Sequence, residues 1–149
     1  MERKRRCHAL HEASVAFSIL KAAEEVLEEH GVPADARIEA LDIEIGALAL
    51  IDLESLRFAL EVLSKGTRFE GAKFNIHIVT PRLRCKRCGY EWTVNADDLD
   101  DEVKLFIHFA PDKVYEMLRC PRCGSRDIEI VEGTDVKLKS IRLAEERKG

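Results

Sequence analysis

The sequence predicts an α+β protein: a small αβ domain, two helices on a three-stranded sheet, into which a cysteine-rich lobe is inserted. Helical and strand periodicities alternate between residues 12 and 79, and two Cys-x-x-Cys-Gly motifs follow them. After Gly133 a last strand-like segment needs a partner, and the N-terminal sheet is the expected one. We therefore expect residues 10–80 and 133–149 to form the αβ domain and residues 81–132 to form the inserted lobe.

The αβ domain is expected to begin with an amphipathic helix over residues 12–30. Apolar side chains recur there at three- and four-residue spacing, and Gly31 is placed to end the helix. A strand follows over residues 37–45, because Leu41, Ile43 and Ile45 alternate with acidic residues.

A second helix and two further strands complete this domain. Asp52 is placed as the N-cap of a helix with a leucine stripe that ends before Gly66. Residues 72–79 alternate as a strand, with His77 on the face turned to solvent. Residues 136–143 are the last strand, with a shift in phase along its length.

The inserted lobe carries the strongest chemical signal of the chain. Four thiolates in two tight turns are the ligand set of a tetrahedral Zn²⁺ site. Two disulfides or a redox motif are the alternatives, but redox motifs rarely come in facing pairs. Because four thiolates leave no open coordination position, such a zinc would be structural. The predicted ligands are Cys85, Cys88, Cys120 and Cys123.

Composition limits the protein class. The net charge is −4 with 35% charged residues of both signs, which argues against a dedicated nucleic-acid binder and fits a thermophile. Zinc thiolates beside an unpaired Cys7 indicate a reducing, cytoplasmic environment. No apolar run approaches a membrane span, and polar residues interrupt the segment after the basic start, so no export signal is expected.

Potential metal ligands also gather where the first helix begins. Cys7, His8, His11 and Glu12 lie within six positions of one another. Alternatively, His11 and Glu12 simply open the helix, where a glutamate suits the positive end of the helix dipole. The pattern alone leaves both interpretations open.

Several motifs together resemble one family. They are the Leu10-His-Glu-Ala-Ser-Val-Ala helix start, Ile45-Gly-Ala-Leu, Leu56-Arg-Phe, and Cys120-Pro-Arg-Cys-Gly-Ser. The chain from Leu10 to Leu143 resembles the HypA nickel-insertion proteins, and its long connection between the cysteine pairs resembles archaeal members. That family inserts a zinc ribbon into an αβ nickel domain, which agrees with the topology expected above.

The resemblance implies a nickel metallochaperone, not an enzyme, that delivers Ni²⁺ to the large subunit of a [NiFe] hydrogenase with a HypB-type GTPase as partner. It assigns His11 as the essential nickel ligand and Glu12 as a ligand through at least its backbone nitrogen. A histidine directly after a free amino terminus offers several nitrogens in one plane, which Ni²⁺ accepts readily. His108 is the candidate for an additional ligand; alternatively it packs between Phe106 and Phe109 with a hydrogen bond to backbone.

This sequence departs from the family pattern in two places. Nine residues precede Leu10, so the nitrogen before His11 is an amide. Either Leu10 is the true start, since some leucine codons initiate translation in prokaryotes, or Cys7 and His8 replace the lost ligand. Ala47 stands where a glutamate is expected, which puts in doubt a partner contact made through that residue.

Two other functions compete with the nickel carrier. A zinc-ribbon nucleic-acid or transcription module would use the basic residues near the cysteines with Tyr90 and Trp92, but arginines also offset the charge of a zinc thiolate centre. A hydrolase using His11 and Glu12 lacks a convincing nucleophile. No Gly-x-x-x-x-Gly-Lys loop is found, so nucleotide hydrolysis is left to the partner.

Overall fold

The computed structural model describes the backbone of residues 2–145 and the side chains of residues 11–145. The chain forms two compact units: Met1–Ile43, Ile51–His77 and Lys137–Gly149 in the first, and Glu44–Leu50 and Ile78–Val136 in the second. The domain limits expected at residues 80 and 133 stay predictions, and the units divide a few residues away from them.

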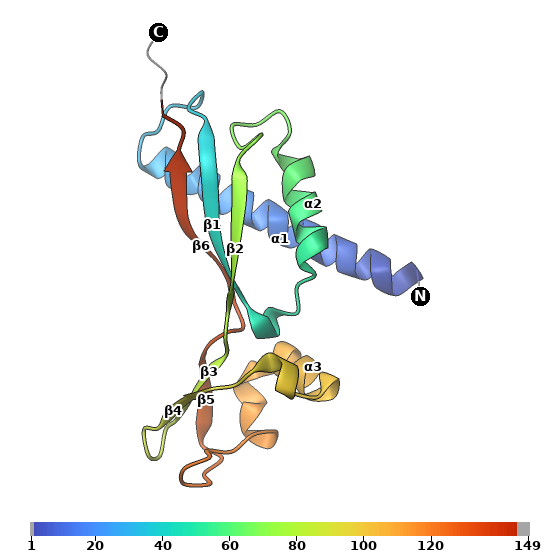
Figure 1. Ribbon diagram of the computed structural model, residues 1–149, viewed down its shortest axis with the longest axis vertical. Coiled ribbons are helices and arrows are strands. Elements are labelled where there is room, and N and C mark those ends of the chain that lie inside the picture. Colours follow the sequence, from blue (N-terminus) through green and yellow to red (C-terminus); the bar gives the residue numbers. More distant parts are fainter. Residues whose placement is uncertain (1, 146–149) are drawn as a thin grey trace. The chain divides into compact units, whose positions relative to one another are not determined.

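The first unit is built from two helices and a sheet of three strands (Figure 1). The strand order is β2-β1-β6, so β1 is central and the last strand of the chain pairs with the N-terminal sheet, as predicted. The elements are α1 (Glu2–Glu29), β1 (Ile38–Gly46), α2 (Leu53–Ser64), β2 (Lys73–Val79) and β6 (Val136–Leu143).

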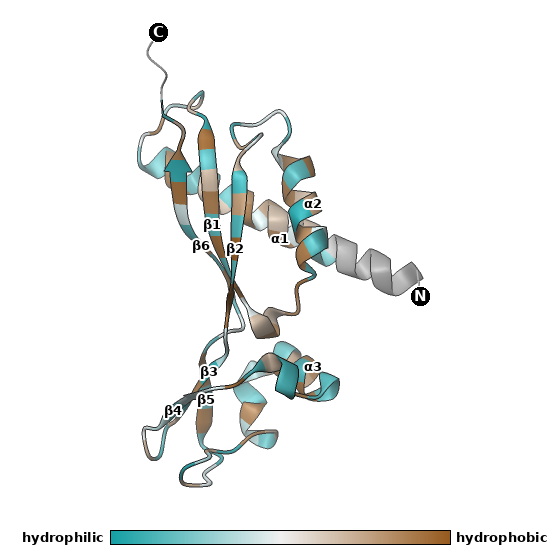
Figure 2. Cartoon of the chain, viewed as in Figure 1, coloured by the Kyte–Doolittle hydropathy of each residue, from teal (hydrophilic) through white to brown (hydrophobic). Residues whose placement is uncertain are grey.

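Periodic apolar residues explain why these elements form and pack. Hydrophobic and hydrophilic bands alternate along β1 (Figure 2), and the buried residues of α1 and α2 recur at helical spacing. The α+β class is thereby confirmed. The core of this unit includes Ala16, Ile19, Ala23 and Leu27 of α1, Leu41 and Ile43 of β1, and Leu56 and Leu60 of α2.

Helix α1 ends where the sequence predicts and begins earlier. At its C-terminus the amide of Val32 donates to the carbonyl of Leu27 over 3.0 Å, and Gly31 adopts a φ of 68°. The helix begins at Glu2 rather than near residue 12. The side chains of Cys7 and His8 lie outside the described residues, so their proposed ligand role has no structural account.

The second unit is a small three-stranded sheet with a helical layer. The strand order is β4-β3-β5, and β3 pairs antiparallel with both neighbours. The elements are η1 (Ala47–Ala49), β3 (Arg82–Cys85), β4 (Glu91–Thr93), η2 (Ala96–Asp98), α3 (Asp101–Phe109), η3 (Pro111–Glu116) and β5 (Ile128–Glu132).

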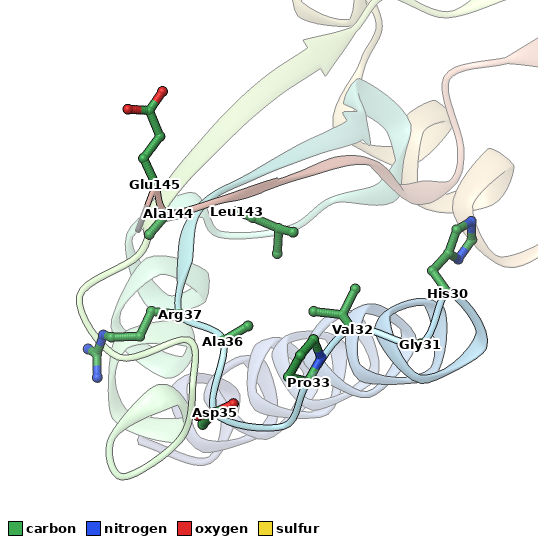
Figure 3. A pocket seen from close by; sticks show the side chains of 10 residues that line it. All are labelled: His30, Gly31, Val32, Pro33, Asp35, Ala36, Arg37, Leu143, Ala144 and Glu145. Atoms are coloured by element: carbon green, nitrogen blue, oxygen red, sulfur yellow. The ribbon is translucent and has the colours of Figure 1, made fainter. Parts of the chain in front are cut away.

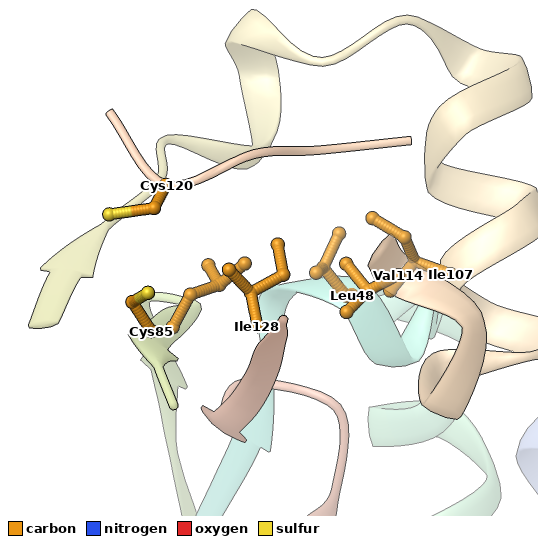
Figure 4. Close-up of a cluster of buried hydrophobic side chains, with 7 residues drawn as sticks. Leu48, Cys85, Ile107, Val114, Cys120 and Ile128 are labelled. Carbon is orange, nitrogen blue, oxygen red and sulfur yellow. The ribbon is translucent and has the colours of Figure 1, made fainter. Parts of the chain in front are cut away.

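Helix α3 is not among the elements that the sequence predicts. The residues in this region indicate only an acidic, turn-rich stretch, followed by a connection to the second cysteine pair. Helix α3 contributes the buried Ile107, and η3 contributes Val114, to a core shared with the cysteines (Figure 4). This core gives the cysteine-rich lobe apolar packing of its own. Its buried members are Leu48, Leu83, Cys85, Ile107, Val114, Cys120 and Ile128.

Candidate metal centres

The two cysteine turns are built alike. In the first, the amide of Cys88 lies 3.4 Å from Cys85 Sγ, and Gly89 donates its amide to the carbonyl of Cys85 over 2.8 Å. In the second, Cys123 and Gly124 make the same two contacts with Cys120, at 3.4 and 2.9 Å. Both glycines adopt a positive φ, which residues with a side chain rarely take up. The Cys-x-x-Cys-Gly pattern is thus required by the turn itself.

The four sulfurs converge on one point. They all lie within 4.8 Å of one another, with Cys85 and Cys123 3.6 Å apart and Cys88 and Cys120 3.7 Å apart. Zn–S bonds of about 2.3 Å in a tetrahedron require S–S separations of about 3.8 Å. A disulfide between partners so placed would need about 2.05 Å. The donor set therefore fits one four-coordinate zinc ion.

The thiols of this cluster do not ionise alike. The backbone amide of Cys88 lowers the pKa of Cys85 against the effect of burial. Burial raises the pKa of Cys120, but the amides of Cys123 and Arg122 outweigh it and bring it to about 7. The amide of Ser125 lowers the pKa of Cys123, yet burial and the neighbouring thiols raise it to about 11. Holding all four as thiolates requires a cation among them.

The basic residues of β3 are engaged by glutamates of the same sheet. Arg82 pairs with Glu91 and Glu132 at 3.1 and 3.3 Å, and Arg84 pairs with Glu129. These ion pairs are partly exposed and contribute little stability. In these pairs the two arginines are bound to glutamates, whereas a nucleic-acid interface would need them for phosphate groups. The pairs therefore count against the ribbon as a nucleic-acid module.

His11 and Glu12 are neighbours in α1 with opposite environments. His11 is exposed, whereas Glu12 is fully buried at 0% exposure. Glu12 Oε1 accepts a hydrogen bond from the Asp52 amide at 3.2 Å. The sequence identifies Asp52 only as the N-cap of the second helix, because no local pattern connects residues forty positions apart.

The backbone amides of residues 11 and 12 are among the predicted nickel ligands, so their hydrogen bonds matter for that site. Residues 11 and 12 lie inside α1, where each amide is donated to the carbonyl four residues earlier. A nickel plane that uses these amide nitrogens requires a chain whose helix starts near residue 10, or a helix that unwinds there. The ligand role of Glu12 through its nitrogen stays a prediction.

His108 belongs to the second unit and lies on α3. Its Nδ1 is 3.3 Å from the carbonyl oxygen of Leu48, and its ring meets Phe109 edge-on with centroids 5.1 Å apart. The contact with Phe109 and the backbone hydrogen bond agree with part of the packing alternative stated above. Nickel ligation by His108 stays a prediction.

The part of the chain whose side chains are described holds no second cluster of three or more histidine, cysteine or carboxylate ligands. A pocket of about 620 Å³ in the first unit includes His30, Asp35 and Glu145, but these side chains point in different directions and His11 is absent from its lining (Figure 3). His77, expected to face solvent, is exposed. No helix among the described residues is long and apolar enough to cross a membrane.

Comparisons with known proteins agree on one family. The family model for hydrogenase/urease nickel incorporation, metallochaperone, hypA matches residues 10–143. A hydrogenase maturation factor HypA of Ignicoccus hospitalis is 37% identical over 139 residues, which covers 91% of this chain and 98% of the relative. The Pyrococcus horikoshii protein of the same name is 34% identical, covering 92% of this chain and 98% of that protein.

Solved structures support the fold. The Ni metallochaperone HypA from Helicobacter pylori superposes with a TM-score of 0.58 at 21% identity, covering 91% of this chain and 98% of its own. A second HypA solution structure gives a TM-score of 0.61 at 24% identity, covering 92% and 98%. At these identities the likeness concerns the fold, while the family model and the relatives decide membership. The chain belongs to the HypA family of nickel-incorporation metallochaperones.

Proposed function

We propose that this protein is a non-enzymatic carrier that binds Ni²⁺ through His11 and delivers it to the large subunit of a [NiFe] hydrogenase. The observation that carries the proposal is the family match beginning at residue 10, which puts His11 second in the matched segment. The exposure of the His11 side chain supports the role, because cargo must enter and leave.

The two metals would have separate roles. Four thiolates close the zinc site, so that ion holds the fold of the second unit. Nickel would take the imidazole of His11 and backbone nitrogens, including that of Glu12, in the planar arrangement that Ni²⁺ accepts and Zn²⁺ disfavours. The imidazole of His108 would be an additional nickel ligand. A partly filled plane leaves room for the acceptor's own ligands, which suits transfer.

The test is a nickel titration of two zinc-loaded chains: the 149-residue form and a form that begins with methionine in place of Leu10. We expect His11→Ala to abolish nickel binding in any form that binds, with zinc content and circular dichroism unchanged. His30→Ala is the matched control, since His30 is exposed just beyond the C-terminal end of the same helix and bonds the carbonyl of Val26.

The outcomes separate the possibilities. Binding by the shorter chain alone would show that the free amine is a ligand. Binding by both would mean that Cys7, His8 or His108 replaces the free amine in the longer chain. A partial loss of nickel affinity in His108→Ala would then identify His108 as the replacement. Nickel binding that is unchanged in His11→Ala would contradict the proposal.

We also propose where a HypB-type GTPase docks. Phe17 and Phe58, on α1 and α2, are 59% and 67% exposed. Phe58 is one wall of a pocket of about 480 Å³, whose lining is mostly apolar, with Ala59 and Val62, and also includes Glu54 and Ser55. Exposed apolar patches of this kind commonly mark partner surfaces.

This docking proposal can be tested with the purified GTPase of the same organism. We expect Phe58→Ser to weaken binding at least about tenfold, as loss of a central aromatic anchor does, while nickel binding is retained. Phe109→Ser is the control, because Phe109 is 79% exposed but lies in the second unit. Equal losses from both variants would contradict the placement.

A further inference from the structure

We infer that the Glu12 carboxylate is a positioning residue, which fixes the His11 turn of α1 to the start of α2, and that it is not itself a nickel ligand. The inference rests on the proposed function for His11. Its structural part, the connection between the two helices, can be tested independently of nickel.

The burial of Glu12 is the first observation. A carboxylate is rarely fully buried unless hydrogen bonds compensate for its lost hydration. Glu12 is 0% exposed and lies in line with Ala16, Ile19 and Ala23, the buried face of α1. A glutamate in that row costs stability unless its carboxyl oxygens find hydrogen-bond partners in the fold.

Helix α2 supplies that partner. Glu12 Oε1 accepts the amide of Asp52, the residue that precedes the first turn of α2, at 3.2 Å. The first amides of a helix lack partners within it, and its N-terminus favours a negative charge.

The side chain of Asp52 does not serve this purpose. It makes no capping bond to the backbone of α2, and its Oδ2 instead accepts the hydroxyl of Ser55 at 2.8 Å. Its carbonyl accepts the amide of Leu56 at 3.0 Å, which begins the helix. The carboxyl oxygen that accepts the amide of Asp52 therefore comes from Glu12, on a different helix.

The consequence for His11 follows from helix geometry. Successive side chains on an α-helix are about 100° apart. With Glu12 held inward against α2, the side chain of His11 is turned to the exposed flank, where it is found. For its carboxylate to bind nickel beside His11, Glu12 would have to leave both its buried position and the amide of Asp52. The geometry thus separates the two side chains of one dipeptide: the His11 imidazole is left to bind nickel, and the Glu12 carboxylate positions the turn.

The experiment compares Glu12→Gln with Glu12→Ala in the zinc-loaded chain length that binds nickel. Glutamine keeps an oxygen that can accept the Asp52 amide but loses the charge, whereas alanine loses both. Glu25→Gln is the matched control, an exposed glutamate of the same helix. The readouts are nickel affinity by calorimetry, the nickel absorption spectrum, and hydrogen exchange at the amide of Asp52.

We expect Glu12→Ala to lose protection at Asp52 and to bind nickel at least about tenfold more weakly, as loss of a supporting hydrogen bond does at metal sites. We expect Glu12→Gln to retain protection and an unchanged nickel spectrum. A nickel spectrum altered in Glu12→Gln would make the carboxylate a ligand and overturn the inference. So would a protected Asp52 amide in Glu12→Ala.

The inference stays testable if Glu12→Ala fails to fold or if the proposed role of His11 fails. If Glu12→Ala does not fold, the spectrum and exchange of Glu12→Gln still decide whether the carboxylate is a ligand. If His11→Ala leaves nickel binding unchanged, the proposed function fails, while exchange at Asp52 continues to report on the connection between the helices.

Discussion

Neighbouring residues of the His-Glu motif have different environments, although the sequence predicts both as nickel ligands. Glu12 is buried against the start of α2, and His11 is exposed. A motif records which residues occur together and leaves open which of them faces the metal. The environments of the two side chains support the proposal that His11 is the ligand and that the Glu12 carboxylate positions it.

Asp42 provides a prediction for a single side chain. It lies on the central strand β1 and accepts the hydroxyl of Ser140 at 2.6 Å and the amide of Asn75 at 3.0 Å. These two hydrogen bonds lower the pKa of Asp42 from 3.8, with smaller contributions from Arg142 and His77. The ionised carboxylate thus connects all three strands of the first unit.

The direction of the shift sets the pH dependence. A carboxyl group with a lowered pKa in the folded state stabilises the protein above its unfolded pKa, and this contribution is lost as the pH falls through the folded pKa. We therefore expect Asp42→Asn to be less stable than the wild type at pH 7, with a difference that shrinks below pH 3.8.

Urea unfolding followed by circular dichroism, at several pH values, measures this difference. Asp35→Asn is the control, because Asp35 is an exposed aspartate of the same unit. A stability difference that stays constant from neutral to strongly acidic pH would show that the charge of Asp42 has no role.

At the scale of elements, periodicity predicts most of the fold. The strand β1, the helix α2 and the late strand β6 are confirmed. Of the predicted leucine stripe of α2, Leu56 and Leu60 are buried, whereas Leu53 and Leu63 are 36% and 39% exposed. Helix α3 escapes prediction, since its nine residues start in an acidic run and bury only Ile107 fully. Asp100 at its N-cap, the Leu105 and Phe109 spacing, and Pro111 beyond it are the available signals.

The two metal motifs are predictable to different degrees. Spacing identifies the four cysteines because each pair forms its own turn, and a turn is a local structure. The contact between Glu12 and Asp52 joins two helices through the tertiary fold. No periodicity or motif encodes such a pair, so single-sequence reasoning could not find it.

Gly46, at the end of β1, provides a prediction for an element. Its φ of −63° suits any residue, but a Cβ there would lie 2.1 Å from the carbonyl carbon of Gly133. A hydrogen bond holds the segments around Gly46 and Gly133 together: the amide of Leu48 donates to the carbonyl of Gly133 at 2.9 Å. We expect Gly46→Ala to lower the free energy of unfolding by about 3 kcal/mol or more, because backbone has to move.

The matched control is Gly31→Ala. Gly31 adopts a φ of 68°, and a Cβ added there would meet nothing within 4 Å, so the cost of the substitution is conformational, about 1–2 kcal/mol. Denaturant unfolding of both variants separates steric overlap from backbone strain. If Gly46→Ala proves as stable as the wild type, the close approach of the two glycines is wrong.

On the scale of the whole molecule, the two units differ in what stabilises them. The first buries apolar side chains from two helices and a sheet. The second has a smaller core, and two of its seven buried members are the predicted zinc ligands Cys85 and Cys120. Zinc should therefore matter far more to the second unit, since structural zinc sites contribute folding energy directly.

This difference predicts how the molecule responds to loss of zinc. We expect a strong chelator, or Cys120→Ser, to abolish amide protection in β3, β5 and around Ile107, while α1, α2 and β2 keep theirs. Hydrogen exchange with mass spectrometry resolves these segments, and released zinc is counted with a colorimetric dye. Cys7→Ser is the control, because Cys7 lies outside the predicted zinc ligands. Unchanged protection in β3 and β5 would refute a structural role for zinc, and loss of protection in α1 and α2 as well would mean that the units unfold as one.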